Sequence, residues 1–131
     1  MSESMLRKID CCMLKTDDLE RAVAFYHGRL GHALLWRTHE AVAFRIPESE
    51  AELVVHLHLE PEVYFVVNDV EDAYRSLLAA GASPLTAPFD IQIGKCAVVR
   101  DPLGNRLAIL DQSKGELVTD AAGNVVGLEK R

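Results

Sequence analysis

Two stretches of the chain repeat apolar residues at the spacing of an amphipathic helix, which has one apolar and one polar face. The apolar positions of the first stretch are Leu19, Ala22, Val23, Tyr26 and Leu30. Those of the second stretch are Val70, Ala73, Tyr74, Leu77 and Leu78. The pattern predicts two helices that each bury one face.

Both predicted helices have suitable residues at their ends. Asp17 can cap the first turn, and Glu20 follows three residues later, as in a capping box. The second stretch has the same spacing between Asn68 and Glu71. A glycine, at position 31 or 81, follows each stretch and can take the left-handed conformation that ends a helix.

Strand-like runs surround the two helices in the same order. The first helix is preceded by the run 9–15 and followed by the runs 33–37, 41–46 and 52–59. The second is preceded by the run 63–67 and followed by the runs 84–89, 95–100 and 106–111. A strong turn signal at 101–105 separates the last two runs. The order of elements is therefore β-α-β-β-β, twice.

The two copies keep a constant offset, since 51 residues separate Asp18 from Asp69 and Ala22 from Ala73. We expect a single α+β domain over 1–131, with module one at about 8–59 and module two at about 62–112. Residues 113–131 form a C-terminal extension that breaks the repeat, as either an added hairpin or a frayed end.

Composition narrows the class of protein. The 131 residues are 49% hydrophobic and 26% charged, which is typical of an ordinary globular chain. A formal net charge of −6 argues against a nucleic-acid or anionic-membrane partner, because no basic run faces phosphates. Neither a signal peptide nor a membrane span is predicted, so we expect a cytoplasmic protein. Three cysteines, two of them adjacent, predict reduced thiols.

Three short motifs, in this order and spacing, resemble the vicinal oxygen chelate superfamily of glyoxalases, bleomycin-resistance proteins and extradiol dioxygenases. The motifs are Asp18 to Tyr26 followed by Leu30-Gly31, then Val70 to Ala73, and finally Asp101 to Asn105. The resemblance covers the chain from Cys11 to about Gly115. It implies that two curled mixed sheets surround a cavity, with the helices on the outside.

The resemblance also implies four metal-ligand positions, one on the first and one on the last strand of each module. The first position falls on Cys11, and the repeat places its partner at Glu62. On the last strands the matching positions are His56 and Ala108. Alanine offers no lone pair, and cysteine departs from the family's usual histidine, glutamine or glutamate. Thiolate, imidazole and carboxylate are nevertheless acceptable to zinc.

Strand alternation places the candidate pocket residues on one face. In the run 53–59 the odd positions are apolar and the even ones carry His56 and His58, so one face should pack under a helix and the other should face a cavity or solvent. We expect His56, His58, Tyr64, Cys11 and Arg106 to line the ligand pocket. Trp36 and Phe44 are either cavity walls or core.

The incomplete ligand set favours a protein that binds a small molecule without a catalytic metal. The alternative is a lyase or isomerase of glyoxalase character, or a dioxygenase, in which a divalent metal (Zn, Ni, Mn or Fe) is held by Cys11, His56 and Glu62, with Glu62 as the catalytic base. A third possibility is an interaction module whose concave surface is filled. The resemblance further implies a homodimer.

Overall fold

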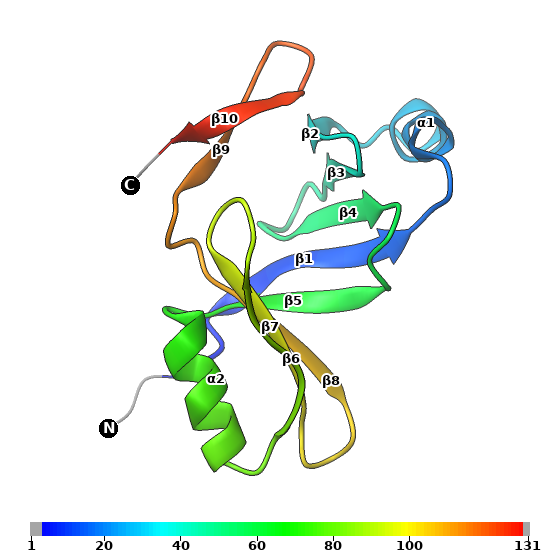
Figure 1. The fold of residues 1–131 in the computed structure, drawn as a ribbon. Helices are drawn as coiled ribbons and strands as arrows, with labels where there is room; N and C mark the ends of the chain where they lie inside the picture. Colours follow the sequence, from blue (N-terminus) through cyan, green and yellow to red (C-terminus); the bar gives the residue numbers. More distant parts are fainter. Residues whose placement is uncertain (1–3, 130–131) are drawn as a thin grey trace. The chain divides into compact units, whose positions relative to one another are not determined.

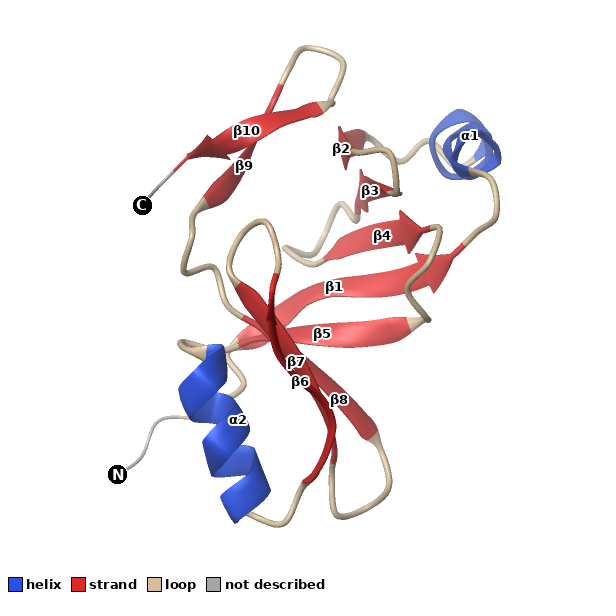
Figure 2. Cartoon of the chain, viewed as in Figure 1, coloured by secondary structure: helices blue, strands red, loops and turns tan. Residues whose placement is uncertain are grey.

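The structure is a computed structural model that describes residues 4–129. The described chain divides into two compact units, each with a helical segment and a set of parallel and antiparallel strands (Figure 1). One unit, module one, holds residues 10–63 and 118–127. The other unit, module two, holds residues 4–9, 64–117 and 128–129 of the described part. Figure 2 shows that strands dominate both units, which confirms the predicted α+β class.

Four strands form the sheet of module one. They are β1 (Lys8–Lys15), β2 (Leu34–Arg37), β3 (Ala41–Arg45) and β4 (Glu52–His56). β2 pairs with β3 and β3 with β4 in antiparallel fashion, whereas β1 and β4 run parallel. In the parallel pair Cys11 lies opposite Glu52, and Lys15 lies opposite His56. This register decides which side chains can meet.

The helix of module one begins as predicted but widens after one turn. α1 (Leu19–Ala22) continues into a π-helix, η1 (Val23–Arg29). The cap is Asp18, not Asp17, because the Asp18 carboxylate accepts the backbone N–H groups of Glu20 and Arg21 at 3.0 and 3.3 Å. The spacing of apolar residues did not reveal the π-helix, in which each N–H bonds five residues back.

The widened turn changes which residues are buried. Leu30, expected on the apolar face, is 53% exposed. The core of module one lies instead between the sheet and the first turns of the helix. Its fully buried members are Ala22, Val42, Phe44 and Val55, with Leu14, Leu19, Val23, Tyr26, Leu34 and Leu53 packed around them. Phe44 is therefore core and not a cavity wall.

Module two repeats the order with a regular helix. Its elements are β5 (Glu62–Val66), α2 (Val70–Ala79), β6 (Ser83–Asp90), β7 (Lys95–Arg100) and β8 (Arg106–Leu110). β5 and β8 are parallel, and β8–β7 and β7–β6 are antiparallel. The cap of α2 is Asp69, whose carboxylate accepts the Asp72 N–H at 3.0 Å. Pro84 and Pro88 in the exposed strand β6 discourage further strand pairing.

A buried carboxylate ties the start of α2 to the sheet of module two. Asp111 is 3% exposed and accepts the backbone N–H groups of Val70 and Lys95, each at 2.9 Å, together with the Ser113 hydroxyl at 2.7 Å. Gly94 packs directly on Asp111 and leaves no room for a Cβ atom. Burial opposes ionisation, but the hydrogen bonds outweigh it and lower the pKa of Asp111.

The C-terminal extension forms a hairpin, which resolves the two alternatives left open by the sequence. β9 (Glu116–Thr119) and β10 (Val125–Glu129) pair across the turn 120–124. The Asp120 carboxylate accepts the backbone N–H groups of Ala122 and Asn124, both at 2.9 Å. The turn reaches the edge strand β2, where the Arg37 N–H donates to the Gly123 carbonyl at 2.8 Å.

Two further sequence expectations can be compared with residues 4–129. Cys11, Cys12 and Cys96 form no disulfide within this part of the chain, as the odd count and adjacent positions predicted. Neither of the regular helices described there is long and apolar enough to cross a bilayer.

Candidate functional site

The module-one sheet presents a polar cluster on the face turned away from its helix. Leu53 and Val55 pack in the helix-covered core, as the alternation predicted, so Glu52 and His56 lie on the opposite face. The register adds the buried Cys11 to this face. We call it the helix-distal face of module one.

Glu52 is the centre of this cluster. Its carboxylate accepts the indole N–H of Trp36 at 2.9 Å, and both side chains are half-buried. Burial raises the pKa of Glu52, the Trp36 hydrogen bond partly offsets the rise, and the charge of Asp10 adds to it. A carboxyl group whose pKa is raised keeps its proton to a higher pH than a free one, and in that form it can donate a hydrogen bond to a ligand as well as accept one.

Cys11 lies beside Glu52 but is a poor metal ligand. Its side chain is only 3% exposed. Burial raises the pKa of the thiol, and the negative charges of Asp10 and Glu52 raise it further. A metal needs the thiolate, whereas these surroundings favour the protonated thiol.

The imidazole ring of His56 is hydrogen-bonded to the loop that follows β4. Its Nδ1 accepts the backbone N–H groups of His58 at 2.9 Å and Leu59 at 3.1 Å. Burial lowers the pKa of His56 and so favours the neutral ring, in which Nδ1 accepts these two N–H groups and Nε2 carries the proton. Neither nitrogen then offers a free lone pair to a metal ion. His56 caps the turn after β4.

The parallel register also separates two of the predicted ligands. Cys11 pairs with Glu52 and His56 pairs with Lys15, four residues further along β1. At the rise of a parallel strand, Cys11 and His56 are roughly 13 Å apart. The structure therefore brings Glu52, not His56, next to Cys11.

The repeat alignment of the last strands needs a correction of two residues. The Thr16 N–H donates to the His56 carbonyl, and 51 residues later the Val67 N–H donates to the Leu110 carbonyl. His56 is therefore equivalent to Leu110, not to Ala108. The one-residue shift assumed from the sequence was too small, because the modules differ in length between helix and last strand.

Module two offers no donor at the predicted fourth position. Ala108 is fully buried and pairs with Tyr64 across β5 and β8. Tyr64 is itself buried and points away from α2, on the same face as Ala108. Arg106 and Glu62 are the first residues of β8 and β5. Arg106 and His58 are exposed, and Glu62 is half-buried.

A catalytic metal ion does not fit these residues. Within residues 4–129 no three histidine, cysteine or acidic side chains are grouped so as to hold an ion. Cys11 favours the protonated thiol, His56 uses Nδ1 for its loop, and Ala108 has no donor atom. The chemistry of the predicted set thus disagrees with the metal-dependent members of the superfamily.

Glu52 was not among the residues predicted for the site, and Trp36 was predicted as either a cavity wall or a core residue. Both residues are visible in the chain, but their meeting depends on the bulge where β2 shifts register against β3 between Leu34 and Trp36. The parallel pairing of the first and last strands would have indicated Glu52 as the neighbour of Cys11. Counting residues from the helix to the last strand did not indicate Glu52.

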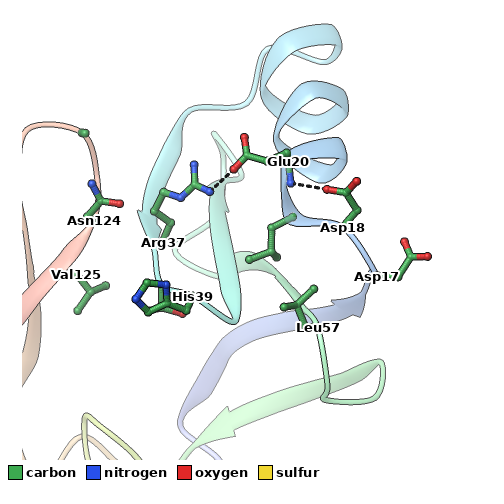
Figure 3. Close-up of a pocket in the computed structure, with 11 residues that line it drawn as sticks. Asp17, Asp18, Glu20, Arg37, His39, Leu57, Asn124 and Val125 are labelled. Atoms are coloured by element: carbon green, nitrogen blue, oxygen red, sulfur yellow. Dashed lines mark hydrogen bonds and ion pairs between the residues drawn. The ribbon is translucent and has the colours of Figure 1, made fainter.

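A separate pocket of ≈ 860 Å³ lies at the helix start of module one. Figure 3 shows that its wall combines the start of α1, the turn after β2 and the C-terminal hairpin. The Arg37 guanidinium pairs with Glu20 at 2.6 Å, and Asp18 is occupied by its capping bonds. His39, on a loop that the sequence left without a motif, lines this pocket. None of the predicted site residues does.

Comparison with known proteins identifies the family. The model of the glyoxalase-like domain matches residues 11–110. No curated protein matches the chain. The chain belongs to the glyoxalase-like domain family and, with it, to the vicinal oxygen chelate superfamily, which confirms the resemblance seen in the sequence.

Solved structures share the fold at low identity. Methylmalonyl-CoA epimerase from Mycobacterium tuberculosis is similar with a TM-score of 0.68 and 16% identity, over 85% of this chain and 91% of that one. A structure described as NAD-dependent benzaldehyde dehydrogenase from Legionella pneumophila gives 0.65 and 20%, over 78% and 97%. Homoprotocatechuate 2,3-dioxygenase from Brevibacterium fuscum gives 0.58 and 21%, over 82% of this chain but 37% of that enzyme.

Proposed function

We propose that the protein binds a small molecule at the helix-distal face of module one, through the Glu52 carboxyl group and without a metal ion. The observation that carries this proposal is the Glu52–Trp36 pair. A half-buried carboxyl with a raised pKa sits against an indole, and the buried side chains of Cys11, Ala43 and Val54 lie on the same face. Isolated polar groups in apolar surroundings fix the orientation of a ligand.

The surroundings of Glu52 favour a neutral ligand with a polar end. A protonated carboxyl group donates a hydrogen bond to a carbonyl or hydroxyl oxygen, and the half-buried Trp36 ring offers an apolar surface beside it. An anionic group is disfavoured there, because Asp10 already places a negative charge near Glu52. Cys11 adds a buried, weakly polar thiol on the same face.

Two measurements test the proposal. Metal analysis of the natively purified protein should find no stoichiometric divalent ion. A thermal-shift screen of uncharged carbonyl and hydroxyl compounds should find ligands that raise Tm, because binding to the native state alone raises its stability. The shift should shrink in Glu52→Leu, which has neither a hydrogen-bond donor nor an acceptor, and persist in Glu48→Leu, at an exposed glutamate of the loop after β3.

Two outcomes would overturn the proposal. One is a stoichiometric metal ion whose removal abolishes ligand binding. The other is an equal thermal shift in wild-type protein, Glu52→Leu and Glu48→Leu, which would place the ligand elsewhere.

A further inference from the structure

A second hollow lies on the helix-covered side of module one and does not involve Glu52. It has a volume of ≈ 670 Å³ and is bounded by the end of β1, the π-helix η1 and the segment after β4. Leu14, Val55 and Pro61 form apolar walls, and Phe25 and Tyr26 form an aromatic one. We call it the π-helix pocket. Its size and apolar lining are typical of sites for small molecules, which span roughly 300–1,000 Å³.

The aromatic wall is held in place before any ligand arrives. Tyr26 packs on the fully buried Phe44 with ring centroids 5.4 Å apart. Phe25 then stands edge-on to Tyr26 at 5.0 Å, with 80° between the ring planes. Phe25 remains 48% exposed, although its position is fixed by this stack. A fixed, exposed ring binds a ligand with little loss of conformational entropy.

Two charged side chains of the pocket, the cation Arg21 and the anion Asp17, are available to bind a ligand. Lys15 also lines it, but its ammonium group pairs with Glu60 at 2.7 Å. The side chains of Arg21 and Asp17 make neither a hydrogen bond nor an ion pair with the part of the chain that the structure describes. A ligand that carries both charges would satisfy both groups and would not be repelled by the net charge of −6.

We propose that the π-helix pocket binds a zwitterionic amino acid with a large apolar side chain. Arg21 would hold the carboxylate with its planar guanidinium group, and Asp17 would hold the ammonium group. The apolar side chain would lie against Phe25, Leu14 and Pro61. This site does not rest on the function proposed for Glu52, since the two lie on opposite faces of the module-one sheet.

Three related compounds separate the contributions of the two charges. L-phenylalanine carries both charges, 3-phenylpropanoate lacks the ammonium group, and phenethylamine lacks the carboxylate. Isothermal titration calorimetry of the full chain should show one site, with L-phenylalanine bound most tightly. Each compound lacking one charge should bind about fivefold more weakly, which corresponds to one exposed ion pair.

Variants assign each charge to its residue. Arg21→Gln should weaken L-phenylalanine and 3-phenylpropanoate about fivefold and leave phenethylamine unchanged. Asp17→Asn should weaken L-phenylalanine and phenethylamine and leave 3-phenylpropanoate unchanged. Phe25→Ala should weaken all three compounds about tenfold. Arg29→Gln, on the same helix but outside the pocket, and Glu52→Gln are the matched controls and should bind like wild type.

Several results would refute the site. Heat absent for all three compounds at 20 mM would do so, as would equal weakening of all three by Arg21→Gln. Loss of binding in Glu52→Gln but not in Phe25→Ala would move the ligand to the other face. If Phe25→Ala changes only the sedimentation of the protein, the pocket is covered by a second copy of the chain and the amino-acid assignment is wrong.

Discussion

The two modules share a backbone plan but differ in what they do with it. Each begins its helix at an aspartate cap, Asp18 or Asp69, 51 residues apart. Module one then widens into a π-helix and carries a half-buried carboxyl group on its open sheet face. Module two keeps a regular helix, and its equivalent face is lined by buried residues such as Tyr64 and Ala108. The two modules therefore share a backbone plan, whereas the π-helix and the Glu52–Trp36 pair are features of module one.

The two modules also differ in the residue that follows their last strand. In module two Asp111 follows β8 and satisfies the N–H of Val70 at the start of α2. The equivalent residue after β4 in module one is Leu57, which has no such role and lines the large pocket instead. Module two is therefore stabilised by a polar contact that module one lacks. At the start of α2 the Val70 N–H is bonded to the Asp111 carboxylate, whereas the start of α1 borders a pocket.

The largest expected difference between the modules is at two glycines. A Cβ atom at Gly94 would collide with the Asp111 carboxylate and backbone, whereas a Cβ atom at Gly28 in η1 would meet nothing within 4 Å. We expect Gly94→Ala to lower the free energy of unfolding by about 3 kcal/mol. Gly28→Ala should leave it unchanged or raise it by about 0.5 kcal/mol. Urea denaturation measures both; equal effects would mean that module two is not locked at this contact.

Removing the buried anion should have the next largest effect. Asp111→Asn replaces one accepting oxygen by a donor that faces backbone N–H groups, so we expect a loss of about 2 kcal/mol at pH 7. The folded pKa of Asp111 lies below its unfolded value near 4, so its stabilisation is present above that value and is lost as pH falls through the folded pKa. The variant should lack this acid-dependent part.

The pH dependence of stability is the control for the Asp111→Asn variant. Wild type and Asp111→Asn should converge in stability as pH falls through the folded pKa of Asp111, where the wild-type carboxyl becomes protonated. A constant difference from pH 7 to pH 2 would show that the substitution acts through packing alone.

Much of the frame could be predicted because it rests on local patterns. The helix positions, the strand order and the offset of 51 residues follow from local spacing. Both caps lie one residue later than predicted, at Asp18 and Asp69. The π-helix could not be predicted, because apolar residues three and four apart fit both helix types. Nor could the Glu52–Trp36 contact, since it depends on a bulge and on pairing between strands distant in sequence. The position of His56 relative to Cys11 was predicted wrongly, because counting residues from the helix does not give the register between paired strands.

The C-terminal extension contains a turn motif that also occurs in module two. The turn Asp-x-x-Gly-Asn occurs at 101–105 and again at 120–124. In both turns the backbone N–H of the final asparagine donates to the aspartate carboxylate, at 2.8 and 2.9 Å, and lowers the pKa of that aspartate. The second occurrence favoured a hairpin over a frayed end.

The two turns differ in their neighbours, which gives a third prediction. Gly104 and Gly123 both have positive φ, at 95° and 88°, so alanine is strained at either. We expect each substitution to cost about 1 kcal/mol, with a further cost at Gly123 because its Cβ would meet the Leu34 side chain at 2.6 Å. Thermal unfolding should rank Gly123→Ala as the more harmful. The reverse order would mean that the hairpin turn does not pack on β2.

The smallest expected effect is at Glu52, where the sign is reversed. Burial raises its folded pKa above the unfolded value near 4.3, so the ionised carboxylate opposes folding. Stability should fall as pH rises from about 4.3 through the folded pKa. Glu52→Gln keeps an oxygen for the Trp36 N–H and carries no charge, so it should gain about 0.5 kcal/mol at pH 7. Thermal unfolding of the variant against Glu48→Gln from pH 4 to pH 8 checks this. A gain at pH 7 in Glu52→Gln, together with a reduced ligand response in Glu52→Leu, would show that Glu52 serves binding and lowers stability. A loss at every pH in Glu52→Gln would make the Glu52–Trp36 contact purely structural.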